Sequence, residues 1–239
     1  MPISRVTTSH GSDMTGTGAT TIATAAFNHT AGNPIVVGIR ADPNGTLITS
    51  VVDTAGNKYY RLCRTASTGK PEMWWTRGDT GHATNVITVT FNGSASFRSV
   101  VCAEYGGFTG TAFIDILPSI TGEFTVVSNT VTTPAFTTVI ADELIVAVSQ
   151  VDATGSTWTP DTGFSTAVQD ASNVVYMQDR IVSAVQTNIT VSATSSSGAS
   201  KNIVAATFCD GEASGGGGGS PGGSPGDGAT ETGFATVGG

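Results

Sequence analysis

AAFNHTAGNPIVVGIR, residues 25–40, recurs without a gap as PAFTTVIADELIVAVS, residues 134–149, within one 239-residue chain. The two stretches share a phenylalanine, Phe27 and Phe136, and both end in an apolar run. A second match follows in the same order, between NVITVTFNGSASFRSVVCAEY (85–105) and TNITVSATSSSGASKNIVAATF (187–208), with a single-residue slip in or near the Ser/Gly turn. Between them, EMWWTR (72–77) corresponds to VYMQDR (175–180). We interpret the body as an internal duplication, with copies at about 23–107 and 132–211.

The runs within each copy have the patterns of strands. Residues 86–91 (VITVTF) alternate between apolar and polar side chains, which is typical of a strand with one wet face. Residues 35–39 (IVVGI) hardly alternate, which predicts a strand covered on both faces. The chain holds 39 Thr, 24 Val and 14 Ile but 4 Leu and 3 Lys, a composition that favours strands over helices. We predict an all-β fold of two tandem antiparallel β-sandwich lobes, jelly-roll or Ig-like, which pack side by side through an apolar face.

The predicted boundaries give an N-terminal arm at 1–20, a first lobe at 21–118, a second lobe at 119–211 and a Gly-rich tail at 212–239. The tail contains five consecutive glycines (215–219) followed by SPGGSPG, and this composition buries too little apolar surface to fold. We expect both ends to be flexible and at least one to become ordered on binding. Their apolar anchors are Ile3 and Val6 in the arm, and Phe234 and Val237 in the tail. A tail without any role is the alternative.

Net charge and hydropathy limit the classes of partner that the chain is expected to bind. Ten Lys and Arg against 18 Asp and Glu give a net charge of −8, which argues against a nucleic-acid partner. No apolar run approaches the roughly 18 residues of a transmembrane helix, so no membrane partner is expected. The first 26 residues lack the apolar core of a signal peptide, so we expect the product to stay in the cell that makes it.

No catalytic constellation is recognisable, and we predict that the protein is not an enzyme and carries no cofactor or metal. His10, His29 and His82 lie in loop-like contexts, and none is near a nucleophile elbow. Asp152 and Asp161 around Gly155 are the nearest approach to a calcium loop, a spacing that many turns share. Cys63, Cys102 and Cys209 favour buried thiols, with a disulfide or a reactive thiol as the alternatives.

Three short motifs have both a structural and a functional interpretation. Trp74-Trp75 places one indole on each face of a strand, so one is expected in the core or at a subunit interface, and the other is a candidate platform for a glycan or a protein. The tripeptide 77–79 (RGD) is a common turn sequence, and it is also a sequence that some integrins bind. Asp179-Arg180, with Arg77 at the matching strand end, predicts ion pairs across strands.

A set of strand-and-turn motifs carries a family resemblance. The motifs are VDTAGNKY (52–59), EMWW (72–75), ITVTFNGSA (87–95), VCAEYGG (101–107), DELIV (142–146), QDRIVSA (178–184) and ATF (206–208). Over about 34–208 the chain resembles a two-lobed β-sandwich unit of tailed-phage virion proteins and bacterial surface proteins. Gln178, where the family more often has an acid, and the cysteines at 102 and 209 depart from its pattern. The resemblance implies a structural or adhesive role and transfers no catalytic residue.

The predicted function is therefore a virion structural protein of a tailed phage, either a capsid decoration protein or a tail-surface protein. Its expected location is the virion, after synthesis in the host cytoplasm. The expected partners are the major capsid or tail protein of the particle and further copies of the chain, for example in a trimer. The alternative is a carbohydrate-binding or adhesive module of a bacterial surface protein, for which Trp74 or Trp75 would contact a surface glycan.

Overall fold

The computed structural model describes residues 2–41, 46–64, 71–108, 112–114, 122–124 and 128–210. Within these ranges the chain forms strands and turns and no helix, so the predicted all-β class is confirmed. A helix able to cross a membrane is accordingly absent from the described part of the chain. The abundance of Thr, Val and Ile explains this outcome, because β-branched side chains fit a pleated surface.

The strands divide into a first half, β1 to β10, and a second half, β11 to β19. The first half contains β1 (Ser4–Asp13), β2 (Ala19–Ala23), β3 (Phe27–His29), β4 (Ile35–Arg40), β5 (Ile48–Asp53), β6 (Tyr60–Arg64), β7 (Glu72–Thr76), β8 (His82–Asn85), β9 (Ile87–Ala95) and β10 (Arg98–Gly106). The second half contains β11 (Ala112–Ile114), β12 (Gly122–Phe124), β13 (Thr130–Thr132), β14 (Glu143–Val151), β15 (Trp158–Pro160), β16 (Ser165–Gln169), β17 (Val175–Val182), β18 (Ser192–Ser195) and β19 (Lys201–Asp210).

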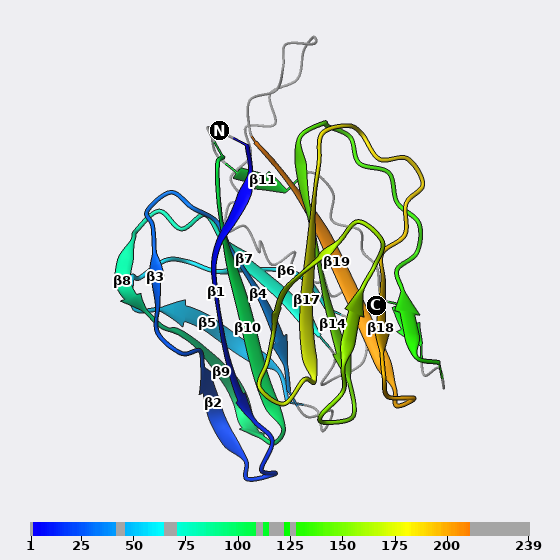
Figure 1. The fold of residues 1–239 in the computed structure, drawn as a ribbon. Coiled ribbons are helices and arrows are strands. Elements are labelled where there is room, and N and C mark those ends of the chain that lie inside the picture. The colour runs from blue at the N-terminus through cyan, green and yellow to red at the C-terminus, as the bar shows by residue number, and fades with distance from the viewer. Residues whose placement is uncertain are drawn as a thin grey trace, which may run out of the picture.

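Each half contributes one large inner sheet and one small outer sheet. The inner sheets have the orders β1-β10-β4-β7-β6 and β11-β19-β14-β17-β16, with β12 also paired to β19. The outer sheets have the orders β2-β9-β5 and β13-β18-β15, and β3 pairs separately with β8. Figure 1 shows the first half at the left, in blue to green, and the second half at the right, in green to orange. Strand for strand, the two inner sheets have the same antiparallel order.

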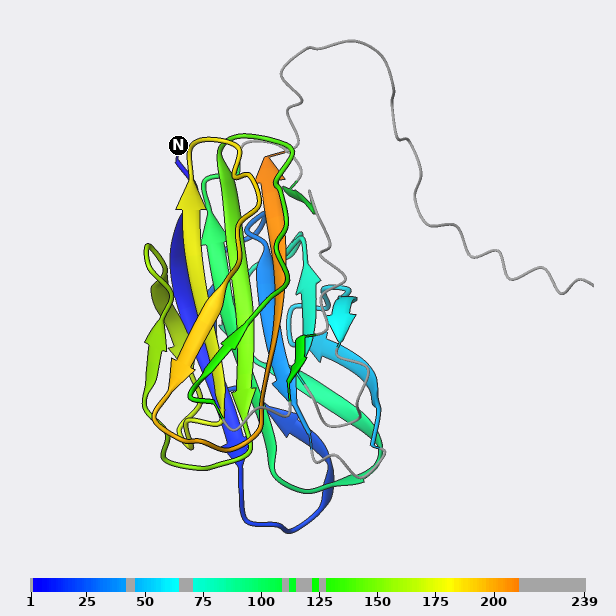
Figure 2. The same cartoon turned by 90° about the vertical axis from the view of Figure 1, so that its right-hand side faces the viewer.

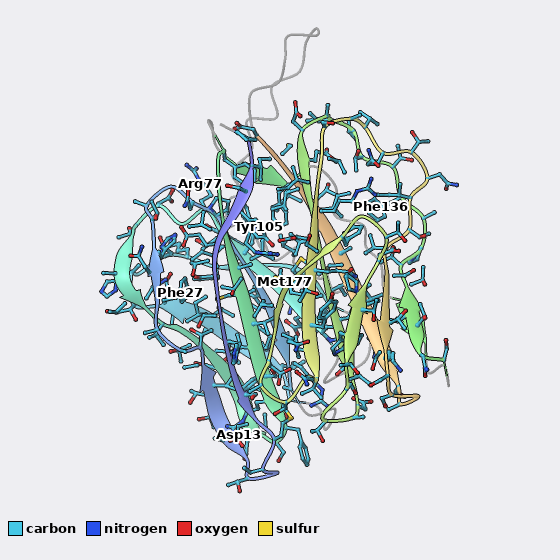
Figure 3. The ribbon with its side chains drawn as sticks, viewed as in Figure 1. Asp13, Phe27, Arg77, Tyr105, Phe136 and Met177 are labelled. Carbon is cyan, nitrogen blue, oxygen red and sulfur yellow. The ribbon has the colours of Figure 1, made fainter. Side chains whose placement is uncertain are left out.

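The core of the described part of the chain consists of three apolar clusters. One lies between the first inner sheet and its outer sheet, with Val37 and Val89 as members, and a second joins the two sheets of the second half, with Ala147 and Ala193. The third joins the inner sheets of the two halves, and includes Val36 and Val146. Residues 35–39 are therefore covered on both faces, as their lack of alternation predicted. In Figure 3, Phe27 and Phe136 lie on opposite sides, with Tyr105 and Met177 between them.

The gapless sequence match at 35–39 is displaced by one residue from the structural equivalence. The gapless match places Ile35 opposite Leu144, yet Ile35 faces its own outer sheet and Leu144 faces the other half. The ladders give the structural equivalence: Gly38 pairs with Val101 and Met73, as Val148 pairs with Val204 and Met177. A one-residue shift exchanges the faces of a strand. A run without alternation carries no signal that would fix this register.

The predicted flexible arm at 1–20 is also wrong. Ser4–Asp13 forms β1 and pairs along β10 from Gly106 to Arg98, and Ala19–Ala23 forms β2 on the edge of the outer sheet. Ile3 is buried in the cluster between the halves. The segment was too polar to be recognised as a strand, because its alternation is carried largely by Ser and Thr. An edge position with solvent on one side accepts such side chains.

Candidate docking surface

Segments of both halves meet at one end of the molecule, which we call the upper end. β1 begins there and β10 ends there, because the two strands are antiparallel. For the same reason β14 begins where β17 and β19 end. Figure 2 shows the N-terminus and the arrowheads of the yellow β17 and orange β19 at this end. The upper end is thus assembled from chain segments that are far apart in the sequence.

A depression of about 620 Å³ lies at the upper end, between the two halves. Its lining is Pro2, Ile3 and Gly107 from the first half, and Ile140, Ala141, Asp142, Ile181, Val182, Ser183 and Asp210 from the second half. Most of these side chains are apolar, and Asp142 and Asp210 add two carboxylates. A depression with this lining has the chemistry of a binding surface.

Exposed apolar side chains surround the depression. Ile140 and Ile181 line it. Val139 precedes Ile140 in the loop before β14, and Val185 lies in the loop that follows β17, the strand of Ile181. Val6 lies beside Gly106, where an added Cβ would be 3.1 Å from the valine Cγ2 atom. These five side chains are between 36% and 68% exposed. Soluble proteins seldom gather large exposed apolar residues in one place without a binding role.

The loop before β14 and the loop after β17 are held together by hydrogen bonds. The Thr138 amide donates to the Gln186 carbonyl at 2.8 Å, and the Gln186 amide donates to the Thr138 hydroxyl, also at 2.8 Å. The Ile140 amide donates to a Glu143 carboxylate oxygen at 3.3 Å. These hydrogen bonds fix the loop of Ile140, and the β14–β17 ladder fixes Ile181, which lowers the entropic cost of binding a partner.

A polar contact between the halves lies just beneath this end. Asp179 of β17 accepts a hydrogen bond from Arg5 of β1 at 2.8 Å and from the Tyr105 hydroxyl of β10 at 3.0 Å. Burial raises the pKa of Asp179, while Arg5 and the hydrogen bonds act in the opposite direction. Asp179 therefore forms an ion pair across strands, as predicted, but its partner Arg5 belongs to the other half. Arg77 pairs with Asp79, at 3.4 Å.

The RGD turn has exposed charged side chains and a buried central glycine that is held by a hydrogen bond. Arg77 and Asp79 are both more than half exposed, while Gly78 has a φ of +70° and is buried. The Gly32 amide donates to the Gly78 carbonyl at 2.7 Å, and an added Cβ on Gly78 would lie 1.9 Å from the Asn33 carbonyl oxygen. Glycine is therefore required here by space as well as by conformation. Figure 3 labels Arg77 in the upper part of the first half.

The residues predicted to bind partners lie at different places. Val6 is exposed, whereas Ile3 is buried between the halves. Trp75 is buried against Phe208, with ring centroids 5.9 Å apart, so it is the core indole. Trp74 is half-buried on the other face, and its indole N–H donates to Glu72 at 3.0 Å. Phe234 and Val237 lie outside the described residues.

The other candidate groups have structural surroundings. His29 is buried with its Nε2 atom 3.1 Å from the Asn33 carbonyl oxygen. Asp152 accepts a hydrogen bond from Arg40 and Asp161 accepts one from the Ser192 amide, so the two carboxylates serve separate contacts. The described residues contain no group of three possible metal ligands. All three cysteines remain thiols, and burial raises the pKa of both Cys63 and Cys102 to about 12.

Comparison of the chain with family models, curated proteins and solved structures gives no match. Function must therefore be inferred from the surface itself. The upper end offers apolar side chains, two carboxylates and contributions from both halves, which suit it to hold another protein. Sequence reasoning missed Ile140 and Ile181. The signal for Ile140 is an apolar residue in the segment before the DELIV motif, where a turn usually has polar residues. Ile181 lies within the QDRIVSA motif, and its strand pattern does not show that the side chain is exposed.

Proposed function

We propose that the chain consists of two tandem β-sandwich lobes derived by duplication, followed by a Gly-rich tail. The equal strand order of the inner sheets supports this interpretation. So do the contacts between the halves. Under the ladder equivalence, Trp75 corresponds to Asp179 and Phe208 to Tyr105. The Trp75–Phe208 contact and the Asp179–Tyr105 contact are therefore counterparts, as a local two-fold relation between the lobes requires.

The function that these features support best is that of a virion structural protein of a tailed phage, attached to the particle as a capsid decoration or tail-surface protein. The observation that carries the proposal is the apolar upper end, where both lobes join in one surface around the depression. Repetition on a symmetric particle would make even a weak contact of this kind sufficient. The family resemblance of the strand motifs points in the same direction.

The alternative is a carbohydrate-binding or adhesive module of a bacterial surface protein. Because Trp75 is buried between the halves, Trp74 is the indole that remains available for it. Particle attachment and glycan binding thus depend on different residues, and they are separable by substitution.

The proposal is tested by sedimentation of the purified chain with particles assembled without it. Ile140→Asp and Ile181→Asp place a charge in the apolar surface, and each is expected to weaken binding by about tenfold or more. Val52→Asp is the matched control, because Val52 is also half exposed but belongs to β5 of the outer sheet. Failure of the unmodified chain to sediment with particles would refute the proposal, and so would normal binding of both upper-end variants.

A further inference from the structure

Among the described residues, the exposed positive charges without an ion pair to another described residue lie close together in the chain. Among the described residues, Arg5, Arg40 and Arg98 form ion pairs with Asp179, Asp152 and Asp13, and Arg77 pairs with Asp79. Lys201 is buried and donates to three backbone carbonyls. The described cations that are exposed and have no ion pair to another described residue are Lys58, Arg61 and Arg64. All three belong to β6 or to the turn before it.

Two of these cations share a face with Trp74. In the β6–β7 ladder, Arg61 is directly opposite Trp74 and Arg64 is directly opposite Glu72, and residues in such positions lie on the same side of a sheet. Trp74 packs only partly against the core of the first half. We call Arg61, Arg64, Glu72 and Trp74 the β6–β7 face.

Glu72 fixes the indole within this face. Its carboxylate accepts the Trp74 indole N–H at 3.0 Å and is itself buried. Burial raises the pKa of Glu72, whereas Trp74, Arg61 and Arg64 act in the opposite direction. The carboxylate is therefore engaged by the indole below the surface, while the guanidinium groups of Arg61 and Arg64 are exposed to a ligand in solvent.

The second half provides an internal comparison. The β16–β17 ladder has the same irregularity as the β6–β7 ladder, and it pairs Thr166 with Gln178 and Gln169 with Tyr176 at the corresponding positions. Neither residue of the edge strand is charged there. Charges on an edge strand often serve to prevent sheet-to-sheet association. The neutral β16 edge indicates that this fold does not need them for that purpose.

We propose that the β6–β7 face binds an acidic saccharide, a glycan that carries carboxylate or sulfate groups. Arginine binds either group through two parallel hydrogen bonds, and an indole fixed by its own hydrogen bond offers an apolar surface to a sugar ring. Arg61 lies directly opposite Trp74 and Arg64 directly opposite Glu72, so both guanidinium groups share a face with the indole and can bind the acidic groups of a saccharide whose ring contacts that indole. An acidic peptide would need the arginines but not the indole surface.

The test is calorimetric titration of the full chain with three oligosaccharides: a heparin fragment with sulfates, an oligogalacturonate with carboxylates, and neutral dextran. We expect binding of at least one acidic probe, weakening with added salt, and no binding of dextran. The double variant Arg61→Gln/Arg64→Gln should lose about tenfold or more in affinity, and Trp74→Leu should also weaken binding. Arg77→Gln, at an exposed arginine outside the face, should bind as the unmodified chain does.

Three results would overturn the proposal. The first is no binding of either acidic probe, and the second is full affinity in the Arg61→Gln/Arg64→Gln variant. The third is that poly-glutamate binds as tightly as the saccharides and independently of Trp74, which would assign the face to an acidic peptide. Because Arg61 and Arg64 are exposed, the double variant is expected to fold, and circular dichroism verifies this. Particle attachment through the upper end is unaffected by these outcomes.

Discussion

Asp53 organises the turn after β5 through its buried carboxylate. The carboxylate accepts hydrogen bonds from the Asn57 amide at 2.8 Å, the Asn57 side chain at 2.9 Å, and the Tyr59 hydroxyl and Asn85 side chain at 3.0 Å each. The sequence motif at 52–59 predicted a turn here, because Asp, Asn and Gly favour turns. Its reach to Asn85 could not be predicted, since that contact depends on a strand 32 residues away.

Substitution Asp53→Asn should lower the free energy of unfolding by about 1–3 kcal/mol at pH 7, because the donors lose a charged acceptor. Burial alone would raise the pKa of Asp53, but the hydrogen bonds from Asn57, Asn85 and Tyr59 outweigh it and lower the pKa. The carboxylate therefore stabilises the fold above its unfolded-state pKa near 3.8, and this contribution is lost as the pH falls through the folded-state pKa. Denaturant titrations at pH 7 and pH 3 should show the difference between the two proteins shrinking in acid. An equal difference at both pH values would contradict this role.

Among the elements, the strands with a clear apolar pattern were predicted and the polar ones were not. Ile35–Arg40 coincides with the strand predicted at 35–39, and Ile87–Ala95 overlaps the strand predicted at 86–91. Ser4–Asp13 was missed because Ser and Thr suit loops as well as an edge strand. The upper end escaped prediction for a different reason. It exists only after five strand ends from both halves have come together.

Deletion of residues 2–19 should destabilise the fold, because it removes β1 from the edge of the inner sheet and Arg5 from Asp179. We expect the melting temperature to fall by about 10 °C or more, since several kcal/mol of packing and pairing are lost. A chain that ends at Gly211 keeps all described strands and serves as the control, with an unchanged melting temperature. Thermal unfolding followed by circular dichroism distinguishes the two. If both truncated chains had the same melting temperature, the prediction would be wrong, and the N-terminal segment would not be needed for stability.

At the scale of the whole molecule, the two halves interlock where Gly38 meets Val148. An added Cβ at Gly38 would lie 2.7 Å from Val148 Cγ1 and 3.1 Å from Val101 Cγ2. The two positions are equivalent in the ladders, so the same site holds the smallest side chain in one half and a branched one in the other. Composition and repeats predicted that the halves would pack through an apolar face. The sequence could not predict which half would have the glycine at this contact and which the valine, because that depends on the exact strand register.

Gly38→Val should destabilise the protein by about 1–3 kcal/mol or more through overpacking. Val148→Gly should also destabilise it, because it leaves a cavity and adds a flexible residue. If the halves meet through equivalent positions, the double variant Gly38→Val/Val148→Gly should be more stable than the sum of the single effects predicts. A double-mutant cycle from denaturant unfolding measures this coupling. Additive effects would show that the two positions do not share one space.

The pairing of β1 with β10 has a consequence for synthesis. Ser4 and Asp13 pair with Gly106 and Arg98, so β1 leaves the ribosome before its partner, which is made about 90 residues later. At the usual elongation rates this delay is roughly 5–20 s. A nascent apolar strand with open hydrogen-bonding groups would be prone to aggregate during that interval. The Ser- and Thr-rich sequence of β1 keeps the waiting strand hydrated until its place in the sheet exists.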